Sequence, residues 1–358
     1  MIADALKLTI YFGERDRTAG GFTADALLDL FGRREIEVSV LLRGAAGFGL
    51  GSHLRTDRLL TLSEDLPLVA VAVDRRARIE ALLDDAEGMV PGGLITLERA
   101  RLAAGDLHPV ALPEELHEVT KLTVYVGRQE RVGGRAAHVA VCELLHRRGV
   151  AGATVLFGVD GTAHGIRRRA RFFGRNADVP LVVIAVGGGV EIARVLPELG
   201  AILARPLVTL ERVRVCKRDG ERLARPPALP VADGDGLRLW GKLMIYSSEA
   251  ARAGGTAQYM AIVEGLRRRG ARGATCLRGV WGFHGAHAPH GDRLLQLGRH
   301  VPVVTVVIDR PADLERSFDL VDELTAERGL VTAEVVPALR ALAGARRHGG
   351  LRLSDPGG

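Results

Sequence analysis

The sequence predicts an α+β fold of three tandem ferredoxin-like units, packed as an intramolecular pseudo-trimer. Three observations predict it. Sequence landmarks recur three times along the chain. Within each repeat, strand-like and helix-like hydrophobic periods alternate. Finally, such a unit covers only one face of its sheet with helices, so the other apolar face needs a partner.

The repeat is visible at several landmarks, always in the same order. Each copy starts with a similar strand: KLTIYFG from Lys7, KLTVYVG from Lys121 and KLMIYSS from Lys242. A glycine pair follows each start. Next come LLRGAAGFG, VLFGVDGTA and CLRGVWGFH, and then an apolar run that begins at Pro67, Pro180 or Pro302. The copies end in GGLITLERARL, RPLVTLERVRV and the weaker RGLVTAEVVPA. This shared order predicts one supersecondary unit per copy.

The periodicities within a repeat predict the order β-α-β-β-α-β. In the second repeat, apolar strands are expected at 122–126, 153–158, 181–186 and 207–215, and a second helix at 190–199. The first helix of that repeat is indicated by one apolar face, made of Ala137, Val141, Leu144 and Leu145. Its counterpart in the first repeat is made of Thr23, Leu27, Leu30 and Phe31. Gly149 and Gly270 follow Arg-rich helix ends, which predicts left-handed C-terminal caps.

These patterns divide the chain into three units and two linkers. The units are residues 1–102, 120–216 and 240–342, the linkers are 103–119 and 217–239, and 343–358 is expected to be a flexible tail. Three open sheets can cover one another around a common axis. Short linkers raise the effective concentration of the units to the millimolar range. A single chain is therefore expected to form the pseudo-trimer as a monomer.

Composition and charge narrow the function classes. The net charge is +6, mostly from arginine, which suits carboxylate and phosphate groups. No nucleic-acid-binding motif accompanies these arginines, so a small anion is favoured over nucleic acid. The three cysteines show no metal or disulfide spacing and are expected to be buried thiols in a cytoplasmic protein. No apolar run is long enough to span a bilayer, so the chain is not expected to be membrane-embedded.

The segments GVAGATVLFGVDG (149–161) and GARGATCLRGVWGF (270–283) resemble the Gly-x-x-Gly-x-Thr-Val and Gly-Phe-Gly region of PII signalling proteins. The whole repeat, with its KLTVYVG start, its glycine pair and LSEDLP (62–67), is most similar to the uncharacterised bacterial PII-like domain called domain of unknown function 190. PII proteins are trimers that bind adenine nucleotides in clefts between subunits. A loop after the second strand contacts their partner proteins.

The resemblance implies candidate ligand-binding residues. Thr154 and Thr275 occupy the place of the family threonine, where the first repeat has Val40. The other candidates are two loop-base motifs, a glycine turn and basic residues near the ends of the last strands: Gly47, Phe48, Gly49, Gly282, Phe283, Gly92, Gly93, Arg101, Lys217 and Arg218. The lysine that follows the glycine turn in PII proteins is replaced by Leu94, Leu207 and Leu330. The three sites are therefore not expected to be equivalent.

The favoured function is a non-enzymatic regulator, since no catalytic constellation is evident. It would bind an anionic small molecule, such as an adenine nucleotide, and signal to a membrane transporter or an enzyme. Two alternatives stay open. His284, His287 and His290 recur at a spacing of three in a loop of the third repeat and could bind zinc or copper. The chain could also be a structural adaptor with degenerate sites. The glycines have a plainer interpretation too, as residues that permit turns and close backbone approach.

Overall fold

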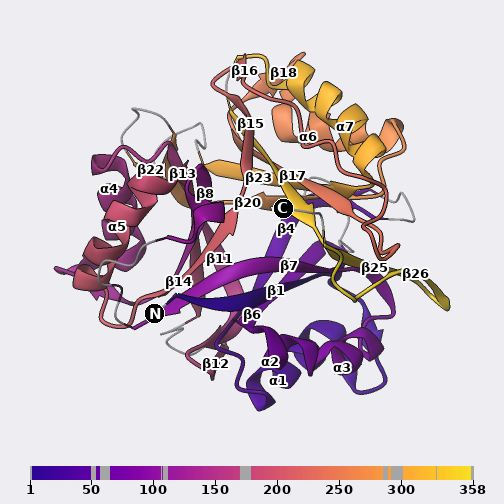
Figure 1. Ribbon diagram of the computed structural model, residues 1–358, viewed down its shortest axis with the longest axis horizontal. Helices are drawn as coiled ribbons and strands as arrows, with labels where there is room; N and C mark the ends of the chain where they lie inside the picture. The colour runs from indigo at the N-terminus through magenta and orange to yellow at the C-terminus, as the bar shows by residue number, and fades with distance from the viewer. Residues whose placement is uncertain are drawn as a thin grey trace.

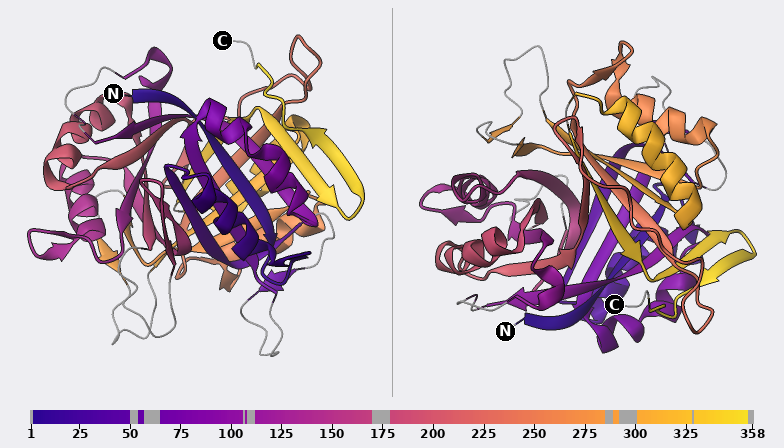
Figure 2. Two further views of the ribbon diagram at one scale, coloured as in Figure 1. Left: turned by 90° about the horizontal axis from the view of Figure 1, so that it is seen from below. Right: turned by 45° about the horizontal axis from the view of Figure 1, so that its top comes forward.

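The computed structural model describes residues 2–49, 54–56, 65–105, 107, 112–169, 179–284, 289–291, 301–327 and 329–355. Helices lie on the outside in three groups, and long strands fill the centre (Figure 1). A view turned by 90° shows the same separation of outer helices from central strands (Figure 2). Among the described helices, none is long and apolar enough to cross a membrane.

The first repeat places one helix between its first two long strands and two short helices before its last strand. Its main elements are β1 (Ile2–Gly13), α1 (Thr23–Arg33), β4 (Val38–Phe48), β6 (Pro67–Arg75), α2 (Arg76–Glu80), α3 (Leu83–Gly88) and β7 (Gly92–Ala104). Its short strands are β2 (Arg17–Thr18), β3 (Gly21–Phe22) and β5 (Arg55–Thr56).

The second repeat has the same order, with one helix of 14 residues, α5, in the place of the two short helices α2 and α3. Its main elements are β8 (Val119–Gly127), α4 (Ala137–Arg147), β11 (Gly152–Ala163), β13 (Pro180–Gly188), α5 (Gly189–Ile202), β14 (Leu207–Arg212) and β15 (Arg214–Arg218). Its minor elements are η1 (Glu114–Leu116), β9 (Arg131–Val132), β10 (Arg135–Ala136), β12 (Ile166–Arg169) and β16 (Glu221–Arg222).

The third repeat ends in an additional hairpin. Its main elements are β17 (Trp240–Ser248), α6 (Gln258–Arg268), β20 (Ala274–Arg278), β21 (Trp281–His284), β23 (Pro302–Asp309), α7 (Pro311–Leu324) and β24 (Leu330–Val336). Three short strands, β18 (Arg252–Ala253), β19 (Thr256–Ala257) and β22 (His290–Gly291), accompany them. The closing hairpin consists of β25 (Ala338–Ala343) and β26 (Arg346–Gly350), which lies in the segment expected to be a flexible tail.

Several local predictions are confirmed. The residues assigned to the apolar faces of α1 and α4 are buried. Gly149 and Gly270 have φ angles of 75° and 77°, the left-handed conformation expected just beyond a helix end. The cysteines Cys142, Cys216 and Cys276 are free and buried. Local hydrophobic spacing and turn chemistry therefore sufficed to place these features.

The predicted fold class, three ferredoxin-like domains packed as a pseudo-trimer, is wrong. The structure is mainly antiparallel sheet, and strands of all three repeats join one 20-stranded sheet. Eight strands of the first two repeats close into a barrel by hydrogen bonding, in the order β1, β6, β4, β11, β13, β8, β14, β7 and back to β1. The prediction considered how bare sheet faces would be covered, whereas the unpaired strand edges also bind one another.

Edge pairing between repeats follows a cyclic pattern. The end of β7 pairs with β14, with Ala103 opposite Val208. β15 pairs with β24, and β25 pairs with the start of β7, with Leu339 opposite Thr96. The last strand of each repeat therefore continues into the sheet of another. The strands of the three repeats enclose a shared apolar core, to which all three repeats contribute side chains.

Glycines allow the second strands of different repeats to approach closely. A methyl group added at Gly161 would lie 2.2 Å from the backbone oxygen of Ser39, and one added at Gly282 would lie 2.3 Å from that of Ala153. Gly47 has the same relation to Ala274, at 2.6 Å. A Cβ atom at any of these positions would clash with backbone. The interpretation of these glycines as residues of close approach therefore has direct structural support.

We expect Gly161→Ala to lower the free energy of unfolding by about 1–3 kcal/mol, the usual cost of forcing extra volume into a packed site. Urea denaturation followed by circular dichroism measures this change. Gly20→Ala is the matched control, because a methyl group at Gly20 would meet nothing within 4 Å. Equal stability of the two variants would contradict the role of Gly161 in strand approach.

Candidate functional site: a buried charged ring and two cavities between repeats

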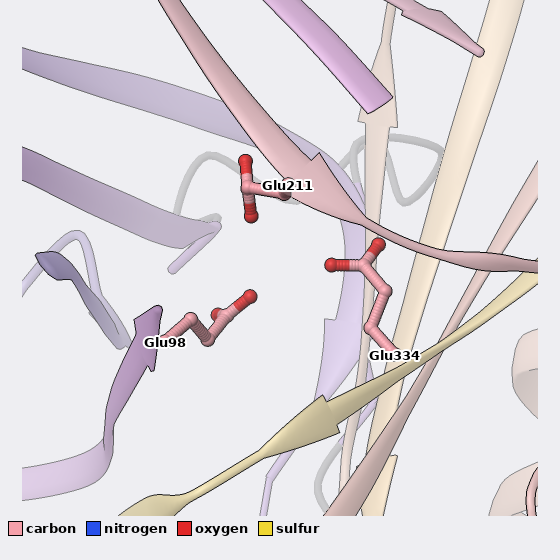
Figure 3. Close-up of side chains that lie close together, drawn as sticks. All are labelled: Glu98, Glu211 and Glu334. Carbon is pink, nitrogen blue, oxygen red and sulfur yellow. The ribbon is translucent and has the colours of Figure 1, made fainter. Parts of the chain in front are cut away.

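Three lysines and three glutamates meet in the interior and form what we call the charged ring. Its members are Lys7, Lys121 and Lys242 from the first strands and Glu98, Glu211 and Glu334 from the last strands. All six are buried. Figure 3 shows the three glutamates, carried by β7, β14 and β24, turned toward a common centre. The three carboxylates lie within 4.8 Å of one another.

Each lysine contacts the glutamate of its own repeat and that of another. Within a repeat the two residues are opposite each other on paired strands, at nitrogen–oxygen distances of 3.2 Å for Lys7–Glu98 and 3.1 Å for Lys121–Glu211. Lys242 lies 2.7 Å from Glu334.

The contacts between repeats complete the ring. Lys121 lies 2.5 Å from Glu334, Lys7 contacts Glu211, and Lys242 contacts Glu98. Positive and negative groups therefore alternate, and each charge has two partners of opposite sign. The three glutamates, one in each repeat, are thus members of ion pairs between strands. Their convergence at one point could have been suspected from the sequence, because each repeat has one lysine and one glutamate at matching places in otherwise apolar strands.

The ring keeps most of its charges despite burial. Burial alone would raise the pKa of the Glu98 carboxyl, but Lys242 and Lys7 hold it below its ordinary value of 4.5. The pKa of Glu211 is lowered in the same way by Lys121 and Lys7. Burial would lower the pKa of Lys7, but Glu211 and Glu98 hold it above 10.5. For Lys121 burial outweighs its two partners, and its pKa is lowered.

We expect Lys121→Met to destabilise the fold by about 3–5 kcal/mol, because it leaves three buried carboxylates with only two lysines to balance them. The double variant Lys121→Met, Glu334→Gln restores neutrality and should cost less than the sum of the two single changes. Urea denaturation of the four proteins measures the coupling. Additive losses would contradict a mutually dependent ring.

Acid should lower the free energy of unfolding, because it protonates the same carboxylates. Because the folded pKa values of Glu98 and Glu211 lie below 4.5, their contribution is fully present above pH 4.5 and is lost as the pH falls through the lowered values. Urea denaturation at pH 7 and at pH 3 should show this loss. In the neutral double variant Glu98→Gln, Lys242→Met the loss should be smaller. An identical acid dependence would show that these carboxylates do not titrate as described.

A cavity of about 290 Å³, the first–third cavity, opens where the first and third repeats meet. It brings together six of the candidate ligand-binding residues: Gly47, Phe48, Gly49, Gly92, Gly93 and Thr275. Much of the remaining wall is apolar and includes Tyr11, Trp240 and Ile308. Its volume is close to the lower end of the range for small-molecule sites, roughly 300–1,000 Å³.

Two arginines and one aspartate supply the charge of this cavity. Arg55 lies 3.0 Å from Asp65, and Arg272 lies 3.4 Å from Asp309. The side chains of both arginines are one-third exposed, at 33% each. Asp16 accepts a hydrogen bond of 2.9 Å from the backbone nitrogen of Gly13. With two guanidinium groups and one carboxylate on its wall, the first–third cavity suits an anion.

The glycine turn of this cavity is constrained by its neighbours. Gly93 has a φ of 135°, and a methyl group added there would lie 2.1 Å from the backbone oxygen of Tyr11. Gly92 and Gly93 begin β7 and pair with Ala343 and Leu342 of β25. The turn that resembles a phosphate cradle is therefore flanked by the C-terminal hairpin.

A smaller cavity of about 60 Å³, the second–third cavity, collects four further candidates: Thr154, Arg218, Gly282 and Phe283. His284 lines it as well. Two candidates lie elsewhere: Arg101 is 2.6 Å from Glu115, and Lys217 is 2.6 Å from Asp322.

The proposed histidine metal site lies partly outside the described residues. His287 is not among them, and only the backbone of His290 is described, opposite Gly282 in a strand pair. Sequence reasoning missed Arg55, Arg272 and Trp240, because it compared residues shared by the repeats and these three are not shared.

Comparison with known proteins agrees with the repeat. The family named DUF190, described as an uncharacterised ACR, matches the chain over residues 5–102, 119–215 and 240–338. The chain belongs to the DUF190 family. One similar relative, a UPF0166 protein of Aquifex aeolicus (strain VF5), is 31% identical over 91 residues, which is 25% of this chain and 86% of the relative. Three tandem copies of the DUF190 unit therefore make up most of this family member.

Proposed function

We propose that this DUF190 protein is a non-enzymatic, PII-like regulator that binds a small anionic molecule, such as an adenine nucleotide, in the first–third cavity. One observation carries the proposal. Six residues selected by resemblance to nucleotide-binding PII proteins, widely separated in the sequence, line one cavity together with Arg55 and Arg272.

The chemistry of the cavity wall supports a ligand with two different ends. Aromatic and aliphatic side chains such as Phe48, Trp240 and Leu339 can cover an apolar ring. The two guanidinium groups can form charge-assisted hydrogen bonds with a phosphate or carboxylate. The backbone of Gly49 lies at the wall, and a methyl group added there would meet nothing within 4 Å, so a ligand can approach this backbone closely.

The cavity is also placed to influence the loop after the second strand. Gly47 at the end of β4 is paired with Arg55 of β5, and the two residues flank this loop. Both line the cavity. A ligand that contacts both would stabilise the base of the loop, and the loop could then bind a partner such as a membrane transporter or an enzyme. Such coupling requires that the ligand bind one loop conformation more tightly than another.

Isothermal titration of the purified chain with ATP, ADP, AMP, adenosine and inorganic phosphate tests the proposal. We expect heat with at least one of the phosphorylated nucleosides and weaker binding of adenosine, which lacks the anion. Arg55→Ala should weaken binding by about tenfold if the guanidinium contacts the ligand. Absence of heat with every compound would contradict a nucleotide ligand.

A further inference from the structure

The three places where neighbouring second strands meet are equivalent in register. Gly47 lies opposite Thr275 where the first and third repeats meet. Gly282 lies opposite Thr154 between the third and second repeats, and Gly161 lies opposite Val40 between the second and first. Backbone geometry alone therefore gives each junction the same opportunity to form a ligand site.

The junctions differ greatly in the volume of the cavity beside them. The first–third cavity has about 290 Å³, whereas the second–third cavity has about 60 Å³, enough for only a few water molecules. At the first–second junction, polar side chains contact one another across the two repeats. The Thr162 hydroxyl lies 3.0 Å from both the Ile36 oxygen and the Ser39 hydroxyl. Near it, the His164 ring lies 3.3 Å from the Glu37 carboxylate.

A few side chains at matching positions account for these differences. Arg272 of the third repeat corresponds to Ala151 in the second and to Glu37 in the first, because each lies three residues before the Thr or Val of its junction. The first–third cavity is thus the junction with arginine at this position. Conversely, Ala341 of its wall corresponds to Arg218, which carries a larger side chain and lines the second–third cavity.

Arg272 is held at the cavity wall by two neighbours. Its backbone nitrogen donates to Asp309 Oδ2 at 3.1 Å, and its Nε lies 3.4 Å from Asp309 Oδ1. Its guanidinium carbon is 5.9 Å from the centre of the Trp240 ring, within the range of a cation–π contact. Trp240 is also particular to this repeat, since the matching positions are Val119 and Ala5. The guanidinium is thus preorganised yet one-third exposed.

We propose that Arg272, positioned by Trp240 and Asp309, is the specificity-determining residue that makes the first–third cavity the single ligand site of the chain. It selects ligands that carry an oxyanion on an apolar body and rejects their neutral counterparts. This inference rests on the proposed function. It adds that one ligand binds per chain, that it binds in the first–third cavity, and that Arg272 recognises its negative charge.

Titration calorimetry with AMP and its neutral counterpart adenosine tests the inference. The native chain should bind one AMP per chain. Arg272→Ala should weaken AMP binding at least about tenfold and adenosine binding less than twofold, because only AMP presents an oxyanion to the guanidinium. Arg272→Gln, which keeps most of the side-chain volume, should give the same result if the alanine variant folds poorly.

Arg218→Ala is the matched control, because it removes an arginine from the smaller cavity. It should leave AMP binding unchanged. A stoichiometry of three, an equal loss in Arg218→Ala, or equal losses for AMP and adenosine in Arg272→Ala would overturn the inference and leave the proposed regulator intact. Failure of AMP to bind while ATP binds would do the same. Failure of every nucleotide to bind would overturn both.

Discussion

The charged ring is the constraint on which the arrangement of the three repeats depends. Six titratable groups are buried at one point, and each has both of its partners of opposite sign only when all three repeats are in place. Removing charges from water is costly unless partners of opposite sign satisfy them. Lys242 of the third repeat contacts Glu98 of the first, and Lys7 contacts Glu211 of the second. A slipped or missing repeat would take one of the two partners away from such charges, so the ring specifies register as well as contact.

Glycines at the second strands act together with the ring. Because Gly47, Gly161 and Gly282 have no Cβ atoms, strands of different repeats come close enough to hydrogen-bond. The result is a continuous sheet whose edges are shared between repeats. The same approach places the ends of the second strands next to the glycine turn and the C-terminal hairpin, and this combination lines the first–third cavity. Architecture and candidate site therefore have a common origin.

The sequence predicted local structure well and long-range pairing poorly. Helix faces follow from spacing, which is why the buried residues of α1 and α4 could be named. The pairing of strands from different repeats depends on which edge strands meet and in what register. The spacing of residues within one repeat does not encode this. For the site, shared motifs indicated Gly47 and Thr275, which line the first–third cavity. Arg272 escaped notice because its importance lies in its difference from Ala151 and Glu37, and a search for repeated residues discards such differences.

The cyclic pairing of strands also has a consequence for biosynthesis. Lys7 emerges from the ribosome early, yet its partner Glu211 follows 204 residues later, and Glu334 later still. Until the final repeat has been translated, Glu98 lacks Lys242, and the start of β7 lacks β25. The nascent chain therefore carries incompletely neutralised polar groups and an open strand edge through most of its synthesis. Such an edge invites association with other chains, so the protein depends on finishing translation before its interior can close.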